Sequence, residues 1–193
     1  METLGKMVVI SGPSGAGKST VCRRILEDER VEFSVSATTR AKREGEVDGR
    51  DYYFLTPEDF RLKIEQGEFI EYAHVHGNLY GTLRQPMDEA LAAGRNYLLE
   101  IDVQGALQIK DQKIPGLYVF IAPPDFEELR RRLVGRGTEA PEVVERRLRK
   151  AEDEFRERVK YDHVVVNNDL ETCVAEVRAL IDLDFESSGE ADS

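Results

Sequence analysis

The chain has 193 residues, of which 40% are apolar and 34% charged, and its formal net charge is −11. This length suits a single domain with a buried core. The acidic balance argues against broad binding to a nucleic-acid backbone, which requires a basic surface. No apolar run approaches the length of a membrane span, and no basic-then-apolar leader opens the chain, so we expect a cytoplasmic protein without a membrane partner. We expect Cys22 and Cys173 to be buried and reduced, because both lie in predicted helices among apolar neighbours.

The spacing of apolar residues predicts strands that alternate with helices. In chain order, the first elements are a strand at Met7–Ile10, a helix at Thr20–Glu29 and a strand at Phe33–Ala37. Residues 38–85 break this rhythm, with a helix at Pro57–Gln66 capped by Thr56 and more strand around Phe69–His74. The remaining expectations are, in order, a helix at Pro86–Ala93, strands at Tyr97–Val103 and Leu117–Ala122, helices at Asp125–Val134 and Pro141–Lys160, a strand at Val164–Val166 and a helix at Leu170–Leu183.

This alternation predicts an α/β fold with a parallel core sheet covered by helices on both faces. The short strands are almost wholly apolar, as burial on both faces requires. We expect one domain, with its core formed by residues 1–37, 86–125 and 160–186. Residues 38–85 form an inserted mixed α/β lobe in this prediction, residues from about 126 to 159 a helical segment, and residues 187–193 a polar tail.

A phosphate-binding loop follows the first predicted strand. Residues 12–19 fit the pattern G-x-x-x-x-G-K-[ST] at every fixed position, with a strand before and a helix after. Backbone without Cβ atoms can wrap around phosphate oxygens, and the helix start adds N–H groups and a positive dipole end. Lys18 offers a cation to the β- and γ-phosphates, and Ser19 offers a hydroxyl to Mg²⁺. The residues predicted to bind the triphosphate are Gly12, Pro13, Ser14, Gly15, Ala16, Gly17, Lys18, Ser19 and Thr20.

Basic residues gather late in the chain. Between Phe126 and Lys160 lie 11 of the 27 Lys and Arg residues, together with 9 acidic residues. Charge alone leaves two interpretations open. The segment either holds a small anion or forms a solvated helix pair with ion pairs at helical spacing.

Several blocks, taken together and in order, resemble the guanylate kinase family, whose members move the γ-phosphoryl group of ATP onto GMP. The blocks are "ISGPSGAGKST", "FSVSATTR", "GEVDGRDYYF", "GEFIEYAHVHGNLYGT", "LLEIDVQGA", "FIAPPDFEELRRRLVGRGTE" and "VVVNND", and the resemblance covers roughly residues 5 to 183. It implies a three-layer P-loop NTPase fold in which the inserted lobe binds GMP and the helical segment is a lid. It also implies ATP and GMP as substrates and Mg²⁺ as the cofactor that accompanies ATP.

The resemblance assigns a GMP site residue by residue. Arginine forks and tyrosine hydroxyls suit a phosphate dianion, and carboxylates suit the N1–H and N2–H₂ edge of guanine, which adenine lacks. The implied phosphate ligands are Arg40, Arg43, Tyr52 and Tyr80, and the implied guanine ligands are Ser36, Glu71, Thr82 and Asp102. Without the resemblance, Glu71 could be an exposed strand residue and Asp102 a structural strand-end residue. Asp102 also has a second candidate role, orienting metal-bound water, and the sequence does not divide this role between Glu100 and Asp102.

The lid supplies the remaining implied residues. Arg132, Arg136 and Arg147 match lid arginines that stabilise the transferred phosphoryl group, and Asn167 matches a position near adenine. Three functions stay open at this stage: a kinase that phosphorylates GMP or dGMP by direct in-line transfer, a P-loop kinase with a different small phosphorylated acceptor, and a non-catalytic binding module of the same fold. An intact phosphate loop favours the first. The sequence makes no prediction about oligomeric state.

Overall fold

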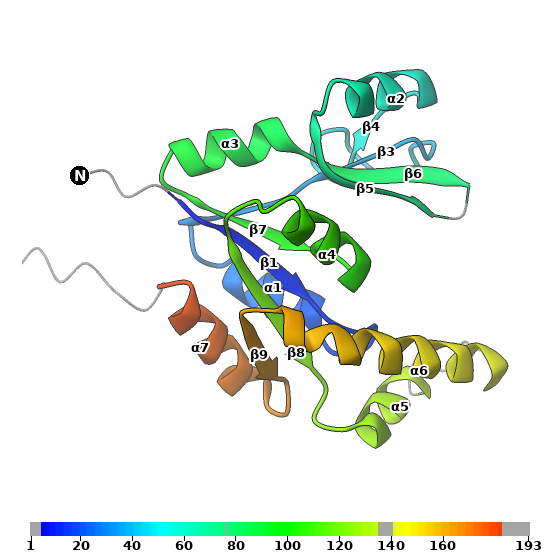
Figure 1. Ribbon diagram of the computed structural model, residues 1–193, viewed down its shortest axis with the longest axis vertical. Helices are drawn as coiled ribbons and strands as arrows, with labels where there is room; N and C mark the ends of the chain where they lie inside the picture. The colour runs from blue at the N-terminus through cyan, green and yellow to red at the C-terminus, as the bar shows by residue number, and fades with distance from the viewer. Residues whose placement is uncertain (1–4, 76, 135–140, 183–193) are drawn as a thin grey trace, which may run out of the picture.

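The computed structural model describes residues 5–75, 77–134 and 141–182, and these ranges form two sheets with helices packed around them (Figure 1). The first sheet is parallel throughout and has the strand order β2-β7-β1-β8-β9. Its strands are β1 (Met7–Ser11), β2 (Val31–Phe33), β7 (Asn96–Glu100), β8 (Leu117–Ala122) and β9 (His163–Val166). The predicted parallel core sheet is therefore confirmed.

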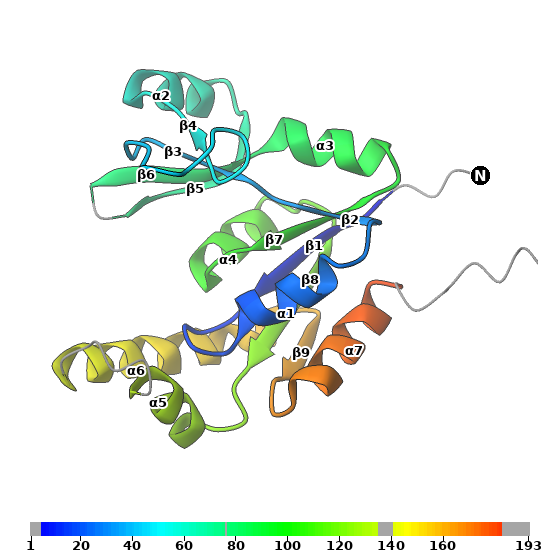
Figure 2. The ribbon, with the colours of Figure 1, turned by 180° about the vertical axis from the view of Figure 1, so that it is seen from behind.

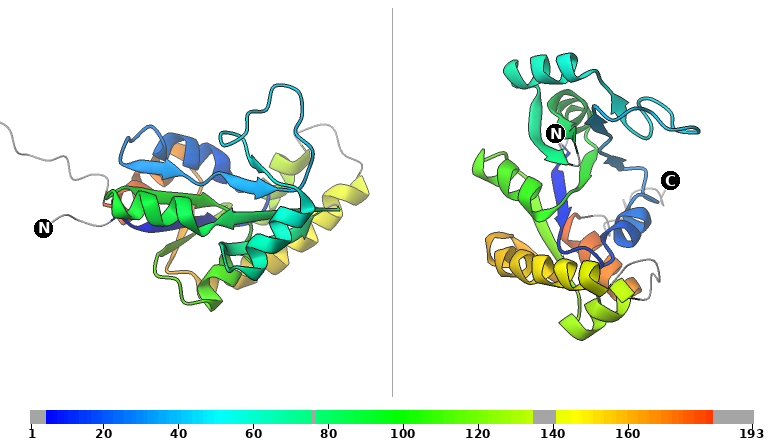
Figure 3. Two further views of the ribbon diagram at one scale, coloured as in Figure 1. Left: turned by 90° about the horizontal axis from the view of Figure 1, so that it is seen from above. Right: turned by 90° about the vertical axis from the view of Figure 1, so that its right-hand side faces the viewer.

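Alternating residues of these strands enter two separate cores. Val8 and Ile10 of β1 pack with helices α1 (Lys18–Ile25) and α7 (Leu170–Leu180), whereas Met7 and Val9 pack with α3 (Arg84–Ala92) and α4 (Val103–Asp111). This division follows from the two-residue period of a strand, which sends neighbouring side chains to opposite faces. Figure 2 shows α1 and α7 in front of the sheet, and Figure 3 shows the three layers from above.

A second, smaller sheet has the order β4-β3-β6-β5. Its strands are β3 (Ser36–Thr38), β4 (Tyr53–Phe54), β5 (Phe69–Val75) and β6 (Asn78–Leu83). Helix α2 (Pro57–Glu65) covers one face, where Phe60 stacks on Phe69 with ring centres 4.3 Å apart. The predicted N-cap of α2 is confirmed, because the Thr56 side chain accepts a hydrogen bond from the backbone N–H of Asp59.

One predicted strand is wrong in the structure. The segment Phe33–Ala37 was expected to be continuous, but the chain leaves the first sheet after Phe33 and enters the second at Ser36. β2 pairs in parallel with β7, and β3 pairs antiparallel with β6. The side-chain pattern "FSVSAT" continues across the change of sheet, so periodicity alone gives no sign of it.

The predicted strand Tyr97–Val103 is too long, and the helix that begins at its end was not predicted. β7 ends at Glu100, and α4 begins at Val103 with Asp102 as its N-cap. The Asp102 Oδ1 atom accepts a hydrogen bond from the N–H of Gly105 at 2.8 Å. Asp102 therefore belongs to a helix start, where a short acidic side chain satisfies a free backbone donor.

Helices α5 (Phe126–Val134) and α6 (Pro141–Arg156) form a pair with its own apolar contact, and a 3₁₀ turn (Glu157–Lys160) follows α6. Leu129 and Leu133 of α5 pack against Val144 and Leu148 of α6. An ion pair between Arg130 and Glu145 also joins the two helices at the surface. Figure 1 shows α6 and the second sheet on opposite sides of the region beyond the carboxyl end of β1. Ligands of open α/β sheets bind at this end of the strands.

The two cysteines lie in the core. Cys22 of α1 and Cys173 of α7 are both buried and unpaired, as predicted. Burial raises the pKa of the Cys173 thiol to about 11 and also raises the pKa of Cys22, so both favour the protonated form. Within the described ranges, no helix combines the length and apolar character that a bilayer crossing needs.

Candidate active site

The loop between β1 and α1 is built from glycines that no other residue could replace without strain. Gly12 has φ 140, and a Cβ atom there would lie 2.2 Å from the backbone oxygen of Ile121. Gly17 has φ 94 and serves as the N-cap of α1. Because glycine has no side chain, the first N–H groups of this helix have no side-chain cap and can face an anion.

Lys18 lies folded back along this loop. Its Nζ atom donates hydrogen bonds to the backbone oxygens of Gly12 at 2.7 Å and Pro13 at 3.0 Å. Burial lowers the pKa of Lys18 below its ordinary value, and the nearby carboxylates of Glu100 and Glu154 oppose that shift. The ammonium group thus lies inside the curve of the loop, where nucleotide phosphates would compete for its donors.

Ser19 and Glu100 place oxygen atoms beside the loop. The Ser19 hydroxyl donates to Glu100 Oε1 at 2.5 Å. Both residues line a cavity of about 180 Å³ together with Lys18 and the loop. Oxygen donors of this kind suit Mg²⁺, which commonly takes only one or two ligands from the protein. Among the described residues, no cluster of three His, Cys, Asp or Glu side chains forms a dedicated metal cage.

The second sheet presents a polar face opposite to the face that α2 covers. Ser36 pairs with Thr82, Thr82 pairs with Glu71, and Thr38 pairs with Tyr80 across three neighbouring strands. Directly paired residues of antiparallel strands share a face, so these side chains form one polar surface. The structure therefore brings together Ser36, Glu71, Tyr80 and Thr82, which the sequence places far apart.

Glu71 of the second sheet lies near Asp102 at the start of α4. The Thr82 hydroxyl donates to Glu71 Oε1 at 2.7 Å, and both residues are buried. The second Glu71 oxygen lies near Gly105, where an added Cβ would be 3.3 Å from Glu71 Oε2 and 3.5 Å from Asp102 Oδ1. Burial raises the pKa of Glu71, and the charge of Asp102 adds to the shift. Gly105, which sequence reasoning missed, leaves open the space between the two carboxylates.

Arg40 lies among aromatic rings at the edge of the same polar face. Its guanidinium carbon is 5.3 Å from the ring centre of Tyr52 and 5.7 Å from that of Phe54. Tyr52 in turn meets Tyr80 edge to face, with ring centres 6.1 Å apart. The hydrogen bonds from Arg40 to Glu46 raise the pKa of Arg40, and the nearby Tyr80 side chain adds a smaller effect in the same direction. Three of the four expected phosphate ligands are therefore clustered, whereas the side chain of Arg43 is exposed.

Of the three arginines expected on the lid, the structure describes two. Arg132 of α5 donates from Nε to Glu128 at 2.8 Å and from Nη2 to the backbone oxygen of Asn167 at 3.1 Å. Arg147 lies half-buried on α6. Arg136 lies outside the described residues.

Asn167 supports the phosphate-binding loop directly. Its Nδ2 atom donates to the backbone oxygen of Ala16 at 2.8 Å, and the residue is 7% exposed. A Cβ atom on Gly17 would lie 2.3 Å from the same Nδ2 atom. Because Arg132 bonds to the backbone of Asn167, α5 is connected to the loop through this residue.

Sequence reasoning also missed Glu154 on α6. This side chain is 13% exposed, and one of its oxygens lies 3.4 Å from the Nζ atom of Lys150. Burial raises the pKa of Glu154, while Lys18 and Asp102 lie close enough to influence it with opposite signs. A single acidic residue in a helix full of charged residues carries no sequence signal for such a position.

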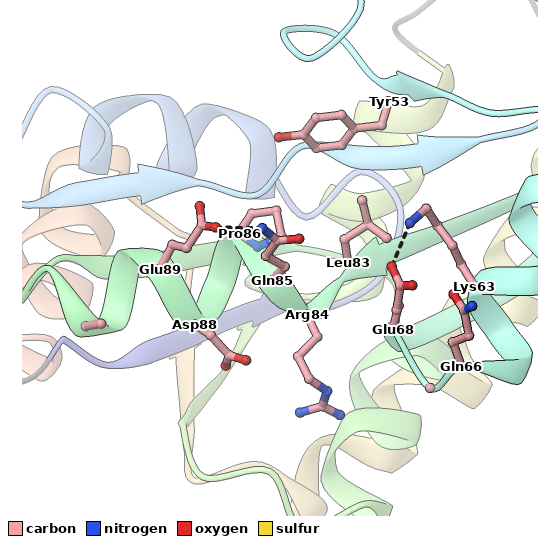
Figure 4. Close-up of a pocket in the computed structure, with 12 residues that line it drawn as sticks. Tyr53, Lys63, Gln66, Glu68, Leu83, Arg84, Gln85, Pro86, Asp88 and Glu89 are labelled. Carbon is pink, nitrogen blue, oxygen red and sulfur yellow. Dashed lines mark hydrogen bonds and ion pairs between the residues drawn. The ribbon is translucent and has the colours of Figure 1, made fainter.

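A wider cavity lies elsewhere among the described residues. It has a volume of about 840 Å³ and is lined by Lys63 of α2, by residues 66–68 that follow this helix, by residues of α3, and by Tyr53 and Leu83 (Figure 4). Tyr53 and Leu83 belong to the apolar cluster beneath α2, so this cavity is on the opposite side of the second sheet from the polar face. The ion pair between Lys63 and Glu68 forms part of its wall. The candidate functional groups described above lie instead at the loop and on the polar face.

The parallel sheet, the glycine loop and the lysine at a helix start define a P-loop nucleotide-binding protein. A family model described as guanylate kinase matches residues 4–183. The chain belongs to the guanylate kinase family, and it is a nucleoside monophosphate kinase of the P-loop NTPase fold.

Individual relatives agree with this assignment. The chain is 49% identical to a guanylate kinase of Symbiobacterium thermophilum over 178 residues, which cover 92% of this chain and 84% of the relative. It is also 49% identical to a guanylate kinase of Lactococcus lactis over 183 residues, which cover 94% of this chain and 89% of the relative. The crystal structure of guanylate kinase from Anaplasma phagocytophilum matches with a TM-score of 0.72 at 35% identity, covering 97% of this chain and 90% of that one.

Proposed function

We propose that this protein transfers the γ-phosphoryl group of ATP to GMP or dGMP, with residues 38–85 as the GMP-binding lobe and residues from about 126 to 159 as the lid. The observation that carries the proposal is the pair Glu71 and Asp102 beside a polar sheet face that also carries Arg40, Tyr52 and Tyr80. The alternatives of another small phosphorylated acceptor or a non-catalytic module leave this set of residues without a use.

Guanine selection follows from the chemistry of the two carboxylates. Glu71 Oε1 is occupied by the Thr82 hydroxyl and Asp102 Oδ1 by the N–H of Gly105, which leaves one oxygen of each residue for the N1–H and amino group of guanine. The Ser36 hydroxyl is offered to the acceptor edge, and the Thr82 hydroxyl would donate there only after releasing its hydrogen bond to Glu71. Adenine would turn an acceptor nitrogen toward a carboxylate and would leave a buried acceptor unpaired, which costs affinity strongly.

The phosphates are held by different means on the two sides. In this proposal, backbone N–H groups of residues 12–20 and the Lys18 ammonium bind the triphosphate, and Asn167 lies toward adenine. Arg40, Arg43, Tyr52 and Tyr80 bind the phosphate of GMP. Ser19, with Glu100 or Asp102 through water, would hold Mg²⁺, which supplies charge neutralisation at the phosphates.

Transfer is direct and in line between two phosphates that the protein brings together. Lys18, Arg132, Arg136 and Arg147 stabilise negative charge on the transferred group, which is the main catalytic demand of phosphoryl transfer. Closure of the lobe and lid excludes water and aligns the reacting atoms. Two protonated, buried thiols agree with a reducing, cytoplasmic setting and with a mechanism that uses no cysteine nucleophile.

A phosphoryl-transfer assay tests the proposal. ATP is supplied with GMP, AMP, CMP, UMP or dTMP, and nucleoside diphosphate formation is followed for each. We expect kcat/KM for GMP to exceed that for AMP by a factor on the order of 10⁴, because the site pairs groups that only guanine offers. Similar values for GMP and AMP would contradict the assignment of the base site.

A further inference from the structure

Glu46 is a carboxylate in the loop after β3 that the proposed function leaves unused. Its Oε1 atom accepts a hydrogen bond from Arg40 Nη2 at 2.7 Å, and its Oε2 atom accepts one from Arg40 Nη1 at 3.1 Å. Oε2 also accepts from the backbone N–H of Arg43 at 2.7 Å. The carboxylate thus contacts both arginines that we assign to the phosphate of GMP, and it does so through different groups.

The ion pair is sheltered from solvent. The side chains of Arg40 and Glu46 are only 15% and 19% exposed, respectively. Tyr52 and Phe54 lie against the guanidinium. Arg40 lowers the pKa of Glu46, and the backbone N–H of Arg43 adds to the shift. A bidentate, partly buried pair of this kind fixes both partners in one geometry, unlike the exposed ion pairs elsewhere on the surface.

The way Glu46 holds Arg40 leaves a defined part of the guanidinium available. A guanidinium has five N–H donors in a plane. Nη1 donates one hydrogen to Glu46 and the other to the backbone oxygen of Ala41, at 2.8 Å. Nη2 donates one hydrogen to Glu46. The hydrogens on Nε and the second on Nη2 lie along the other edge of the fork. That edge can meet two oxygens of a phosphate, and Tyr80 lies at the same guanidinium.

We propose that Glu46 is a positioning residue for the phosphate of GMP. It turns the Nε–Nη2 edge of Arg40 toward the substrate and fixes the backbone of Arg43, and it does not itself touch the substrate. The inference rests on the proposed function, because it assumes that Arg40 binds the phosphate of the acceptor nucleotide. If Glu46 were instead a competitor that must leave before phosphate binds, its removal would improve GMP binding.

The variant Glu46→Gln tests this role, with Glu44→Gln as the matched control from the same loop. Glu44 is exposed and lies outside the proposed site. We expect Glu46→Gln to raise the KM for GMP about tenfold or more, because it weakens two charge-assisted hydrogen bonds. The KM for ATP should stay within about twofold, since the loop that binds ATP is separate. Glu44→Gln should change neither value.

A double-mutant cycle with Arg40→Lys separates positioning from a general loss of structure. If Glu46 acts through the Arg40 fork, adding Glu46→Gln to Arg40→Lys should raise the KM for GMP by less than about twofold. The inference would be overturned if the two substitutions had multiplicative effects on the KM for GMP. It would also be overturned if Glu46→Gln left the KM for GMP unchanged or lowered it, or raised the KM for ATP equally. The proposed function fails separately, if the unaltered protein does not phosphorylate GMP.

Discussion

Lys18 lies within the loop that we propose binds the triphosphate. Two backbone oxygens of the loop hold its ammonium group, and burial lowers its pKa. In the proposed site, phosphate oxygens would offer this ammonium group stronger acceptors and an opposite charge.

We therefore expect Lys18→Ala to lower kcat by a factor of about 10² to 10³, a loss typical of removing one group that stabilises transition-state charge. Steady-state kinetics with ATP and GMP measure this change. Lys63→Ala is the control, because Lys63 pairs with Glu68 at the cavity behind the second sheet. Near-normal kcat in Lys18→Ala would be incompatible with the assigned role.

Glu71 is a carboxyl group whose ionisation opposes folding. Burial and the charge of Asp102 raise its pKa above the ordinary value of 4.5. The stability that protonated Glu71 contributes is fully present below pH 4.5 and is lost as the pH rises through the folded-state pKa. Burying the Glu71 carboxyl group therefore carries a cost in stability at neutral pH.

Glu71→Gln removes this titration and keeps an oxygen for the Thr82 hydroxyl. We expect the difference in Tm between the variant and the unaltered protein to shift in favour of the variant between about pH 4 and about pH 7. Thermal melts across this range, with the exposed Glu44→Gln as control, measure the shift. A difference that stays constant with pH would show that Glu71 does not titrate differently in the folded protein.

At the scale of helices and strands, the local sequence pattern predicts whether a segment is a helix or a strand better than it predicts which strand a given strand pairs with. The strand Leu117–Ala122 and the cap at Thr56 follow from composition and spacing, and both are found where predicted. The switch between Phe33 and Ser36 could not be predicted in this way, because consecutive alternating residues pair with strands distant in sequence. Such pairing depends on contacts between residues that are far apart in the sequence, which a short stretch of sequence does not show.

The same limit applies to the site. The loop at residues 12–19 is contiguous, so its pattern identifies it directly. The predicted strand Tyr97–Val103 includes Asp102 near its end because most residues before it are apolar, and Gly105 weakens the helical pattern that follows. The roles of Glu100 and Asp102 could not be divided from sequence, whereas the structure bonds Glu100 to Ser19 and brings Asp102 toward Glu71. The contacts that make Glu46 and Glu154 notable form only when the chain folds, so neither residue stands out in the sequence.

Helix α2 supports the second sheet from the side that faces away from the polar surface. Phe60 is fully buried and stacks on Phe69. We expect Phe60→Ala to lower the free energy of unfolding by about 3 to 5 kcal/mol, because it leaves a cavity in a small core. It should also raise the KM for GMP more than the KM for ATP, since the sheet carries the acceptor site.

Leu62→Ala on the same helix is the matched control. Leu62 is 50% exposed, so its truncation should change the free energy of unfolding by no more than about 0.5 kcal/mol. Denaturant unfolding and initial-rate kinetics on both variants check the two expectations. Equal rises in the KM values for GMP and ATP in Phe60→Ala would argue that α2 supports the whole molecule and not the acceptor site in particular.

For the whole molecule, the arrangement of sheets explains how two anions are handled by one chain. The parallel sheet supplies the glycine loop at the end of β1, and the second sheet supplies the polar face with Glu71 and Arg40. The helix pair α5–α6 lies on the other side, connected to the loop through Arg132 and Asn167. In the proposed mechanism, the lobe and the lid would close over the two phosphates while the parallel sheet keeps its packing.

A crystal structure with GMP and a non-hydrolysable ATP analogue bound together tests this arrangement most directly. We predict that the triphosphate lies on residues 12–20 and that the N1–H and amino edge of guanine faces Glu71 and Asp102. GMP bound instead in the larger cavity beside Tyr53 and Arg84, or a guanine ring turned so that its donor edge meets neither carboxylate, would contradict the proposed site.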